Sequence, residues 1–286
     1  MSRAGDPEWE RLAAGLERVR SSAAQRYGDP LIQITLADRG IRGAVGLPSQ
    51  AKEIRGLVEA VWPGAACRLL ALAERRPRAG LYPDQEPLLV LRRPPGESPE
   101  LTTQLLPGDP GAGLLAVRPG RYLVRAPGQA VGWVSAQSVF RWGPPPPPRP
   151  LGPPGGWDPE RVRDSALHFL GAPYVFGATG AGGLDCSGLT WRAHLAGGVL
   201  LPRNSLAQRQ VGVRVGSTSL RLGDLVCAVY RGPRHTSHVA LALGADEVIH
   251  ACSELNRVRR ESLADFRQRY RILTVRRIPG GDARSQ

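Results

Sequence analysis

Residues 173–190 read PYVFGATGAGGLDCSGLT, and this stretch decides how the second half of the chain folds. Its glycines gather in a loop before Cys186, and an apolar segment of helical character follows, beginning with Leu189 and Trp191. This order predicts a thiol at a helix N-terminus, where free backbone N–H groups and the helix dipole favour the thiolate and can hold an oxyanion. The alternative is an ordinary buried cysteine beside a glycine-rich turn.

Two histidines downstream of Cys186 lie on one predicted β-hairpin. Residues 238–250 read HVALALGADEVIH, which is two apolar runs around a turn at 244–246. With the turn there, His238 and His250 fall on one face of the sheet, opposite or diagonal to each other. His238 is then placed to take the Cys186 proton, while His250 fixes its tautomer. A single strand histidine is usually structural, but this combination indicates nucleophilic catalysis.

The remaining histidines and cysteines are interpreted as structural. His235 belongs to the loop that enters the hairpin and is assigned to its rim, whereas His168 and His194 fall in helical segments where packing or exposure is expected. The four cysteines are too widely spaced for a disulfide framework. A zinc site using the last three cysteines and a histidine lacks short paired ligand spacings. We therefore predict no metal and no cofactor, with Cys252 in the packing.

A proline-rich stretch, GPPPPPRPLGPPGG at 143–156, divides the chain into two kinds of sequence. Proline removes backbone donors and favours an extended, semi-rigid conformation, so the stretch predicts an interdomain linker. A ligand for a partner's aromatic groove is the alternative interpretation. At the other end, residues 1–28 predict a helix, because Trp9, Leu12 and Leu16 recur at intervals of three to four.

Between the predicted helix and the linker, short apolar runs are broken by glycine and proline, as in small β-barrels. A weak repeat relates residues 48–54 to residues 95–101, which predicts two copies of one module at 29–87 and 88–142. Residues 120–125 and 132–134 resemble the last strands of bacterial SH3-like domains. We therefore expect two small SH3-like β-barrels, and chance similarity of proline-punctuated strands is the competing explanation.

Residues 157–275 resemble the NlpC-type family of papain-like cysteine peptidases, which predicts a peptidase domain at 157–286. The matching segments occur in the family's order: 171–177 before the nucleophile, LDCSGL at 184–189, LPRNS at 201–205, LGDLV at 222–226, SHVA at 237–240 and VIHA at 248–251. The resemblance implies an α+β fold, in which a helix carrying the nucleophile packs on an antiparallel sheet carrying the histidines.

The same resemblance implies a role for each site residue. Cys186 would be the nucleophile, His238 the base and His250 the orienting third residue, and the Tyr174 hydroxyl would assist the oxyanion or the substrate. The remaining residues are expected on the substrate side of the site, with the γ-D-glutamyl subsite lined by the first two: Asp185, Ser187, Arg203, Asn204 and Ser205.

One branch of this family pairs SH3-like domains with the peptidase, acts in the cytoplasm and recycles murein peptides with a free N-terminal L-alanine. The present sequence has Asn204 where that branch tends to carry aspartate, Ala130 where it carries tyrosine, and Asp109 where it carries glutamate. Asp109 is a candidate substrate contact from the SH3-like side. Fewer carboxylates would meet the amine, which puts a strict requirement for a free N-terminus in doubt.

The sequence thus predicts an endopeptidase that hydrolyses the γ-D-glutamyl–diamino acid bond of murein stem peptides, with murein peptide or peptidoglycan as partner. The alternatives are an exported hydrolase of intact wall and a wall-binding module with a retired active site. The net charge of +13 is compatible with polyanions, but we expect no nucleic acid partner. No apolar stretch of signal length and no run of about 18 apolar residues is visible, which favours a cytoplasmic protein without a membrane span.

Overall fold

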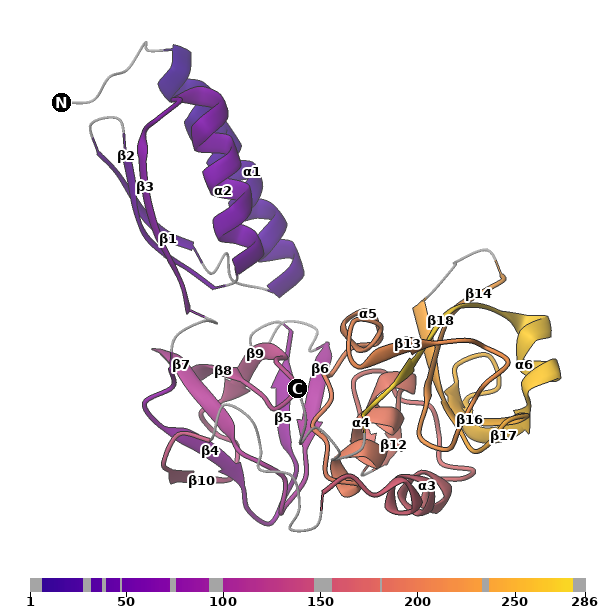
Figure 1. Cartoon of the computed structure of the whole chain (residues 1–286). Coiled ribbons are helices and arrows are strands. Elements are labelled where there is room, and N and C mark those ends of the chain that lie inside the picture. Colours follow the sequence, from indigo (N-terminus) through magenta and orange to yellow (C-terminus); the bar gives the residue numbers. More distant parts are fainter. Residues whose placement is uncertain are drawn as a thin grey trace.

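The computed structural model describes residues 7–27, 32–37, 40–46, 48–72, 76–92, 100–146, 156–180, 182–232 and 237–279. Three units follow one another along the chain (Figure 1): an α/β unit at the N-terminus, an all-β unit in the middle and an α+β unit at the C-terminus. Among the described helices, none is long and apolar enough to cross a membrane.

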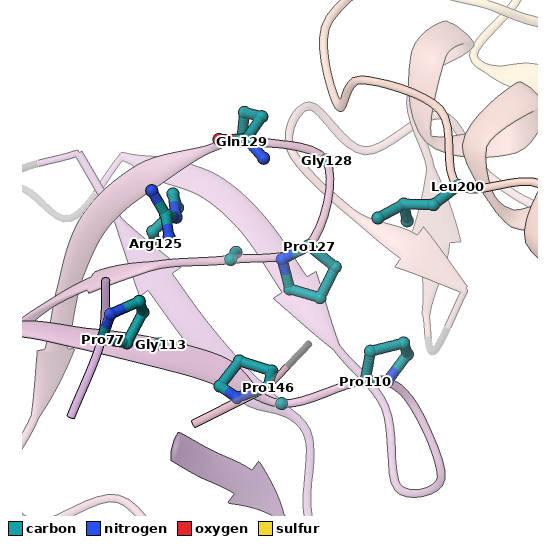
Figure 2. A pocket seen from close by; sticks show the side chains of 11 residues that line it. Pro77, Pro110, Gly113, Arg125, Pro127, Gly128, Gln129, Pro146 and Leu200 are labelled. Atoms are coloured by element: carbon teal, nitrogen blue, oxygen red, sulfur yellow. The ribbon is translucent and has the colours of Figure 1, made fainter. Parts of the chain in front are cut away.

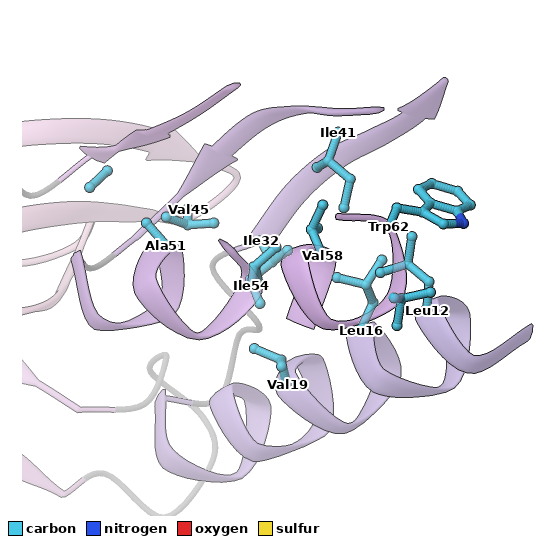
Figure 3. Close-up of a cluster of buried hydrophobic side chains, with 12 residues drawn as sticks. Leu12, Leu16, Val19, Ile32, Ile41, Val45, Ala51, Ile54, Val58 and Trp62 are labelled. Carbon is cyan, nitrogen blue, oxygen red and sulfur yellow. The ribbon is translucent and has the colours of Figure 1, made fainter. Parts of the chain in front are cut away.

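The N-terminal unit is a three-stranded sheet with two helices packed on one face (Figure 1). Its elements are α1 (Pro7–Tyr27), β1 (Ile32–Ala37), β2 (Gly40–Val45), α2 (Pro48–Val61) and β3 (Ala66–Ala71). Strands β1 and β2 pair antiparallel, and β2 and β3 pair parallel through the crossover helix α2. One core joins both helices to the sheet (Figure 3), with Leu12 and Leu16 of α1 beside Ile54 and Val58 of α2.

The predicted SH3-like barrel at 29–87 is therefore wrong, and the predicted helix at 1–28 is part of the same unit rather than a separate segment. The decisive signal is the spacing of Ala51, Ile54, Val58 and Val61, which is helical and buries one face of α2. Residues 48–54 are helical while Leu101 begins a strand, so the described parts of the predicted repeat differ in structure.

The middle unit is a seven-stranded antiparallel sheet in the order β10-β4-β7-β8-β9-β5-β6. Its strands are β4 (Gly80–Pro83), β5 (Leu88–Leu91), β6 (Leu101–Leu105), β7 (Ala112–Arg118), β8 (Arg121–Arg125), β9 (Val131–Ser135) and β10 (Phe140–Gly143). The predicted boundary at 88 is too late, because β4 pairs with β7 and β10 and belongs to this sheet. Residues 147–155 of the predicted linker lie outside the described residues.

The C-terminal unit packs helices against a six-stranded antiparallel sheet in the order β13-β18-β14-β15-β16-β17. The helices are α3 (Pro159–His168), α4 (Cys186–Ala196), α5 (Ser205–Gln208) and α6 (Leu263–Arg269). The strands are β13 (Val213–Val215), β14 (Leu225–Tyr230), β15 (Ser237–Ala242), β16 (Glu247–Cys252), β17 (Arg257–Ser262) and β18 (Tyr270–Arg277), beside the short pair β11 (Thr179–Gly180) and β12 (Gly183–Leu184).

The register of this sheet confirms the predicted hairpin. Leu241 pairs with Ile249 and Ala242 with Val248, so the connection runs through residues 243–246 and the two histidines occupy diagonal positions on one face. Helix α4 packs on β15 and β16 through Leu189 and Ala193, which share a core with Leu241 and Ile249. The nucleophile helix therefore lies against the strands that carry the histidines.

The middle and C-terminal units meet along β6 and the loop after β8. Gly177 approaches so closely, at φ +79°, that a Cβ there would lie 2.4 Å from the Leu101 carbonyl oxygen. The Thr179 hydroxyl donates to the Gln104 carbonyl oxygen at 2.8 Å. The Arg203 N–H donates to the Gly128 carbonyl oxygen at 2.9 Å. These contacts cover the edge strand β6, which would otherwise expose unpaired backbone groups.

An ion pair completes this interface. Asp109 of the middle unit accepts two hydrogen bonds from the Arg192 guanidinium of α4, and the two side chains are 6% and 13% exposed. A small pocket nearby is lined by prolines of the middle unit and by Leu200 (Figure 2). Arg125 is the one ionisable side chain that lines this pocket, so we do not assign a catalytic site to it.

Replacing Asp109 by asparagine should destabilise the assembled chain. The variant keeps an acceptor for the Leu106 N–H but leaves the Arg192 charge half-buried and unpaired. We expect Asp109→Asn to lower the free energy of unfolding by roughly 3 kcal/mol, measured by urea denaturation with tryptophan fluorescence. Asp84→Asn is the matched control, because its pair with Arg141 is exposed and should contribute within about 0.5 kcal/mol. Equal effects would contradict the assigned role.

Candidate active site

Cys186 is the first residue of α4, and Asp185 caps this helix. The Asp185 carboxylate accepts the Gly188 N–H at 2.6 Å and the Ser187 hydroxyl at 3.1 Å, and its second oxygen accepts the Gly177 N–H at 2.7 Å. An aspartate N-cap satisfies amides that the first turn leaves without helical partners. The thiol is held at the helix start because the loop before it and the helix after it are bound to one carboxylate.

Burial determines the state of the free thiol. Burial raises the pKa of Cys186 to about 12, and the Asp185 carboxylate acts in the same direction, while backbone N–H groups of Val239 and Ser187 oppose it. The expectation that the helix N-terminus favours the thiolate is thus outweighed in the free site. Deprotonation needs a neighbouring base.

The candidate base is His238, and a chain of hydrogen bonds leads from it through His250 to Glu261. His238 Nε2 lies 2.9 Å from His250 Nδ1, and His250 Nε2 lies 2.8 Å from Glu261 Oε1. Glu261 as a carboxylate only accepts, so His250 carries its proton on Nε2 and accepts from His238 at Nδ1. His238 is consequently protonated on Nε2, which leaves its Nδ1 as the basic atom.

Glu261 is the member of this line that the sequence analysis missed. It lies on β17 with a side chain 1% exposed, and its Oε2 faces the guanidinium groups of Arg259 and Arg269. Two arginines allow the carboxylate to remain ionised in the interior. The sequence of β17, RVRRES, has no apolar alternation that would mark Glu261 as buried, and it does not reveal which strand carries the partner of His250.

Both imidazoles are neutral in the free protein. Burial lowers the pKa of His238 well below 6.5, and the neighbouring His250 lowers it further. Burial also lowers the pKa of His250 to about 3, with Arg269 and Arg259 adding to the effect and Glu254 opposing it. A neutral imidazole can accept a proton, so His238 has the form that a general base requires.

Aromatic rings fix the plane of His238. The Tyr270 ring stacks on it with centroids 4.4 Å apart and 16° between the planes, and Phe266 packs against both rings, with its centroid 4.6 Å from Tyr270 and 6.0 Å from His238. The Tyr270 hydroxyl donates to Glu254 Oε2 at 2.6 Å. The His238 ring is therefore oriented both by its hydrogen bond and by packing.

An open cavity of about 1130 Å³ gives access to the site. It brings together most of the residues predicted from the sequence: Tyr174, Asp185, Cys186, Ser187, Arg203, Asn204, Ser205 and His238. The middle unit forms the opposite wall with Arg92, Leu101, Thr102, Gln129, Ala130 and Val131. His250 is 0% exposed and lies behind His238.

Several of these predicted substrate residues are bonded within the protein. The Arg203 guanidinium donates to both Asp185 oxygens at 3.0 and 2.9 Å, to the Ser187 hydroxyl at 3.0 Å and to the Thr103 hydroxyl at 2.9 Å. Arg203 is 3% exposed, so it neutralises the helix cap and anchors the middle unit. Asn204 caps α5 by accepting the Ala207 N–H at 2.9 Å.

Tyr174 keeps its proton at the mouth of the site. Burial raises the pKa of its hydroxyl, and a Cys186 thiolate and the negative charges of Asp185 and Glu254 raise it further. The hydroxyl is thus a donor near the nucleophile, as the predicted oxyanion role requires. Ser205 lies farther along the cavity, with its hydroxyl 3.0 Å from that of Ser237.

The predicted substrate contact of Asp109 is wrong. Its carboxylate is bound by Arg192 and by the Leu106 N–H, and it does not line the cavity. The turn around Gly108, at φ +90°, directs the carboxylate toward α4. Asp109 therefore joins the units instead of meeting the substrate.

The other histidines and cysteines divide as follows. His194 is fully buried, with its ring nitrogens against the Thr190 and Gly223 carbonyl oxygens and its ring stacked on Trp157, which confirms packing. His168 is exposed at the end of α3, and His235 lies outside the described residues. Cys252 is buried beside Tyr270 and Glu254. Across the described ranges, no group of three or more potential ligands is arranged to hold a metal ion.

The site lies in a segment that is similar to a known family. Residues 171–277 match the NlpC/P60 family. A probable endopeptidase of Corynebacterium glutamicum is 38% identical over 104 residues, 36% of this chain and 48% of the relative. A γ-D-glutamyl-L-lysine dipeptidyl-peptidase of Bacillus cereus is 37% identical over 84 residues, 29% of this chain and 25% of the relative. The chain thus spans half or less of these relatives.

A solved structure of an NlpC/P60 family protein from Bacillus cereus aligns over 72% of this chain and 65% of its own length. The sequences are 22% identical and the TM-score is 0.40.

Replacing Glu261 by glutamine should weaken the base. The amide can donate to His250 and permit the wrong tautomer, and it removes the charge that would stabilise a protonated imidazole. We expect alkylation of Cys186 by iodoacetamide at pH 7 to slow by roughly 10- to 100-fold, measured by peptide mass spectrometry. Glu247→Gln is the control, because that carboxylate pairs with Arg260 at an exposed site. Equal rates in the two variants would exclude the relay.

Proposed function

We propose that this chain, whose residues 171–277 match the NlpC/P60 family, is a cysteine endopeptidase that hydrolyses the γ-D-glutamyl–diamino acid bond of murein stem peptides. The observation that carries the proposal is the hydrogen-bonded line from His238 through His250 to Glu261, together with Cys186, which lines the same large cavity as His238. A relative named for the γ-D-glutamyl-L-lysine bond supports the choice of substrate.

The reaction follows from the protonation states. His238 Nδ1 takes the thiol proton as the Cys186 sulfur attacks the scissile carbonyl carbon. The Tyr174 hydroxyl and the first-turn amides of α4 are donors for the resulting oxyanion. The protonated His238, stabilised through His250 by the Glu261 carboxylate, then gives its proton to the leaving amine. Water, deprotonated by His238, hydrolyses the thioester and restores the thiol.

The middle unit, in the role of the predicted SH3-like domain, would restrict the substrate. Its residues form one wall of the cavity, so a long or cross-linked polymer has less room than a single peptide. This favours small murein peptides, and hence peptide recycling, over intact wall. A cytoplasmic location would fit that role.

Incubation with defined muropeptides tests the proposal. We expect mass spectrometry to show cleavage between D-glutamate and the diamino acid by the full chain, and no product from Cys186→Ala. Cleavage that requires a free N-terminal amine would support a recycling enzyme, and cleavage of intact peptidoglycan would support a wall hydrolase. If no muropeptide gives a product that depends on Cys186, the peptidase proposal is wrong and a binding module takes its place.

The pH dependence of kcat/KM offers a second test. Burial and His250 depress the pKa of His238, so this base is lost only when the pH falls through a value below 6.5. We therefore expect the acid limb of the profile to lie at least about one pH unit below that of a free histidine. A half-maximal point at or above pH 6.5 would contradict the neutral, buried imidazole described above.

A further inference from the structure

Some of the charged residues that line the catalytic cavity have an ion-pair partner among the described residues of the protein, and one does not. Asp185 and Arg203 form a buried pair at 2.9 Å, and Arg92 pairs with Glu100 at 3.0 Å. Glu254 also lines the cavity, yet within the described ranges no arginine, lysine or histidine forms an ion pair with it. Glu254 is therefore an exposed carboxylate that lines the cavity and can pair with a cationic group of a ligand.

The Glu254 carboxylate is held in place rather than mobile. Oε2 accepts the Tyr270 hydroxyl at 2.6 Å and the Cys252 thiol at 3.3 Å, and Oε1 accepts the Ser253 hydroxyl at 3.0 Å. Burial alone would raise the pKa of Glu254, but these hydrogen bonds lower it below its ordinary value. The group is thus ionised at neutral pH and is oriented before any ligand arrives.

The Glu254 carboxylate lies close to the groups that are proposed to react. The Tyr270 ring that binds Glu254 stacks on His238, and the negative charge of Glu254 acts on both Tyr174 and His250. A substrate lying between Tyr174 and His238 therefore passes next to this carboxylate. Covering an ionised carboxylate with a neutral group costs free energy, whereas an ammonium group replaces the lost water with a charge-assisted hydrogen bond.

We propose that Glu254 binds a primary ammonium group of the substrate and so sets the specificity of the cavity. The inference rests on the proposed function, because murein stem peptides carry such a group at the free N-terminus and on the side chain of the diamino acid. The family branch described above tends to have an aspartate, a tyrosine and a glutamate at the three positions that hold Asn204, Ala130 and the occupied Asp109 here. Glu254 supplies the carboxylate that these positions lack.

Binding to the Cys186→Ala protein tests this inference without depending on turnover. Calorimetry would compare L-alanyl-γ-D-glutamyl-L-lysine with two analogues, one with norleucine in place of lysine and one with an acetylated N-terminus. We expect one analogue to bind about tenfold more weakly, which identifies the recognised ammonium. Adding Glu254→Gln should abolish this difference, because the amide keeps an acceptor for Tyr270 but loses the charge. Adding Glu247→Gln, at an exposed pair outside the cavity, should preserve it.

The outcomes separate the inference from the proposed function. If both analogues bind as tightly as the parent peptide, or if the difference survives Glu254→Gln, Glu254 is not an ammonium site even where the active enzyme cleaves the peptide. A purely structural role through Tyr270 and His238 would weaken all three peptides equally and would likewise overturn the inference. Absence of any binding, together with absence of cleavage by the unmodified chain, would overturn both proposals.

Discussion

The hydrogen bond between His238 Nε2 and His250 Nδ1 is the constraint from which the catalytic half takes its order. It joins diagonal positions on neighbouring strands, and these meet only in the register in which Leu241 pairs with Ile249. The bond also has a direction, because the Glu261 carboxylate makes His250 a donor on its far side. The pairing of strands β15, β16 and β17 therefore decides that Nδ1 is the basic nitrogen of His238.

Burial of this line has consequences for the nucleophile as well as for the base. The same exclusion of water that keeps both imidazoles neutral raises the pKa of the Cys186 thiol. The free site therefore holds a neutral thiol and two neutral imidazoles. Preorganised donors such as the Tyr174 hydroxyl would be most effective once a bound substrate has displaced water from the cavity.

The cavity itself is a product of two units. One wall belongs to the C-terminal unit and the other to the all-β unit, and buried polar contacts hold the walls together through Arg203, Asp185 and the Asp109–Arg192 pair. Positive-φ glycines permit the close approach, because a Cβ at Gly128 would lie 2.7 Å from the Leu201 carbonyl oxygen. The charges that sequence reasoning assigned to the substrate are mostly used to build this interface.

The sequence alone determined the elements whose signals are local. The glycine-rich loop before Cys186 and the apolar runs around residues 244–246 predicted the nucleophile helix and the histidine hairpin, since helix starts and hairpin turns depend on adjacent residues. Tertiary structure decided the pairing of distant residues: Glu261 behind His250, Arg192 on Asp109 and Arg203 on Asp185. It also decided that 32–71 form an α/β unit, because a parallel pair such as β2 and β3 joins strands separated by a whole helix. The periodicity of neighbouring residues does not show which distant side chain will pair with a given carboxylate. The role of each carboxylate depends on that partner.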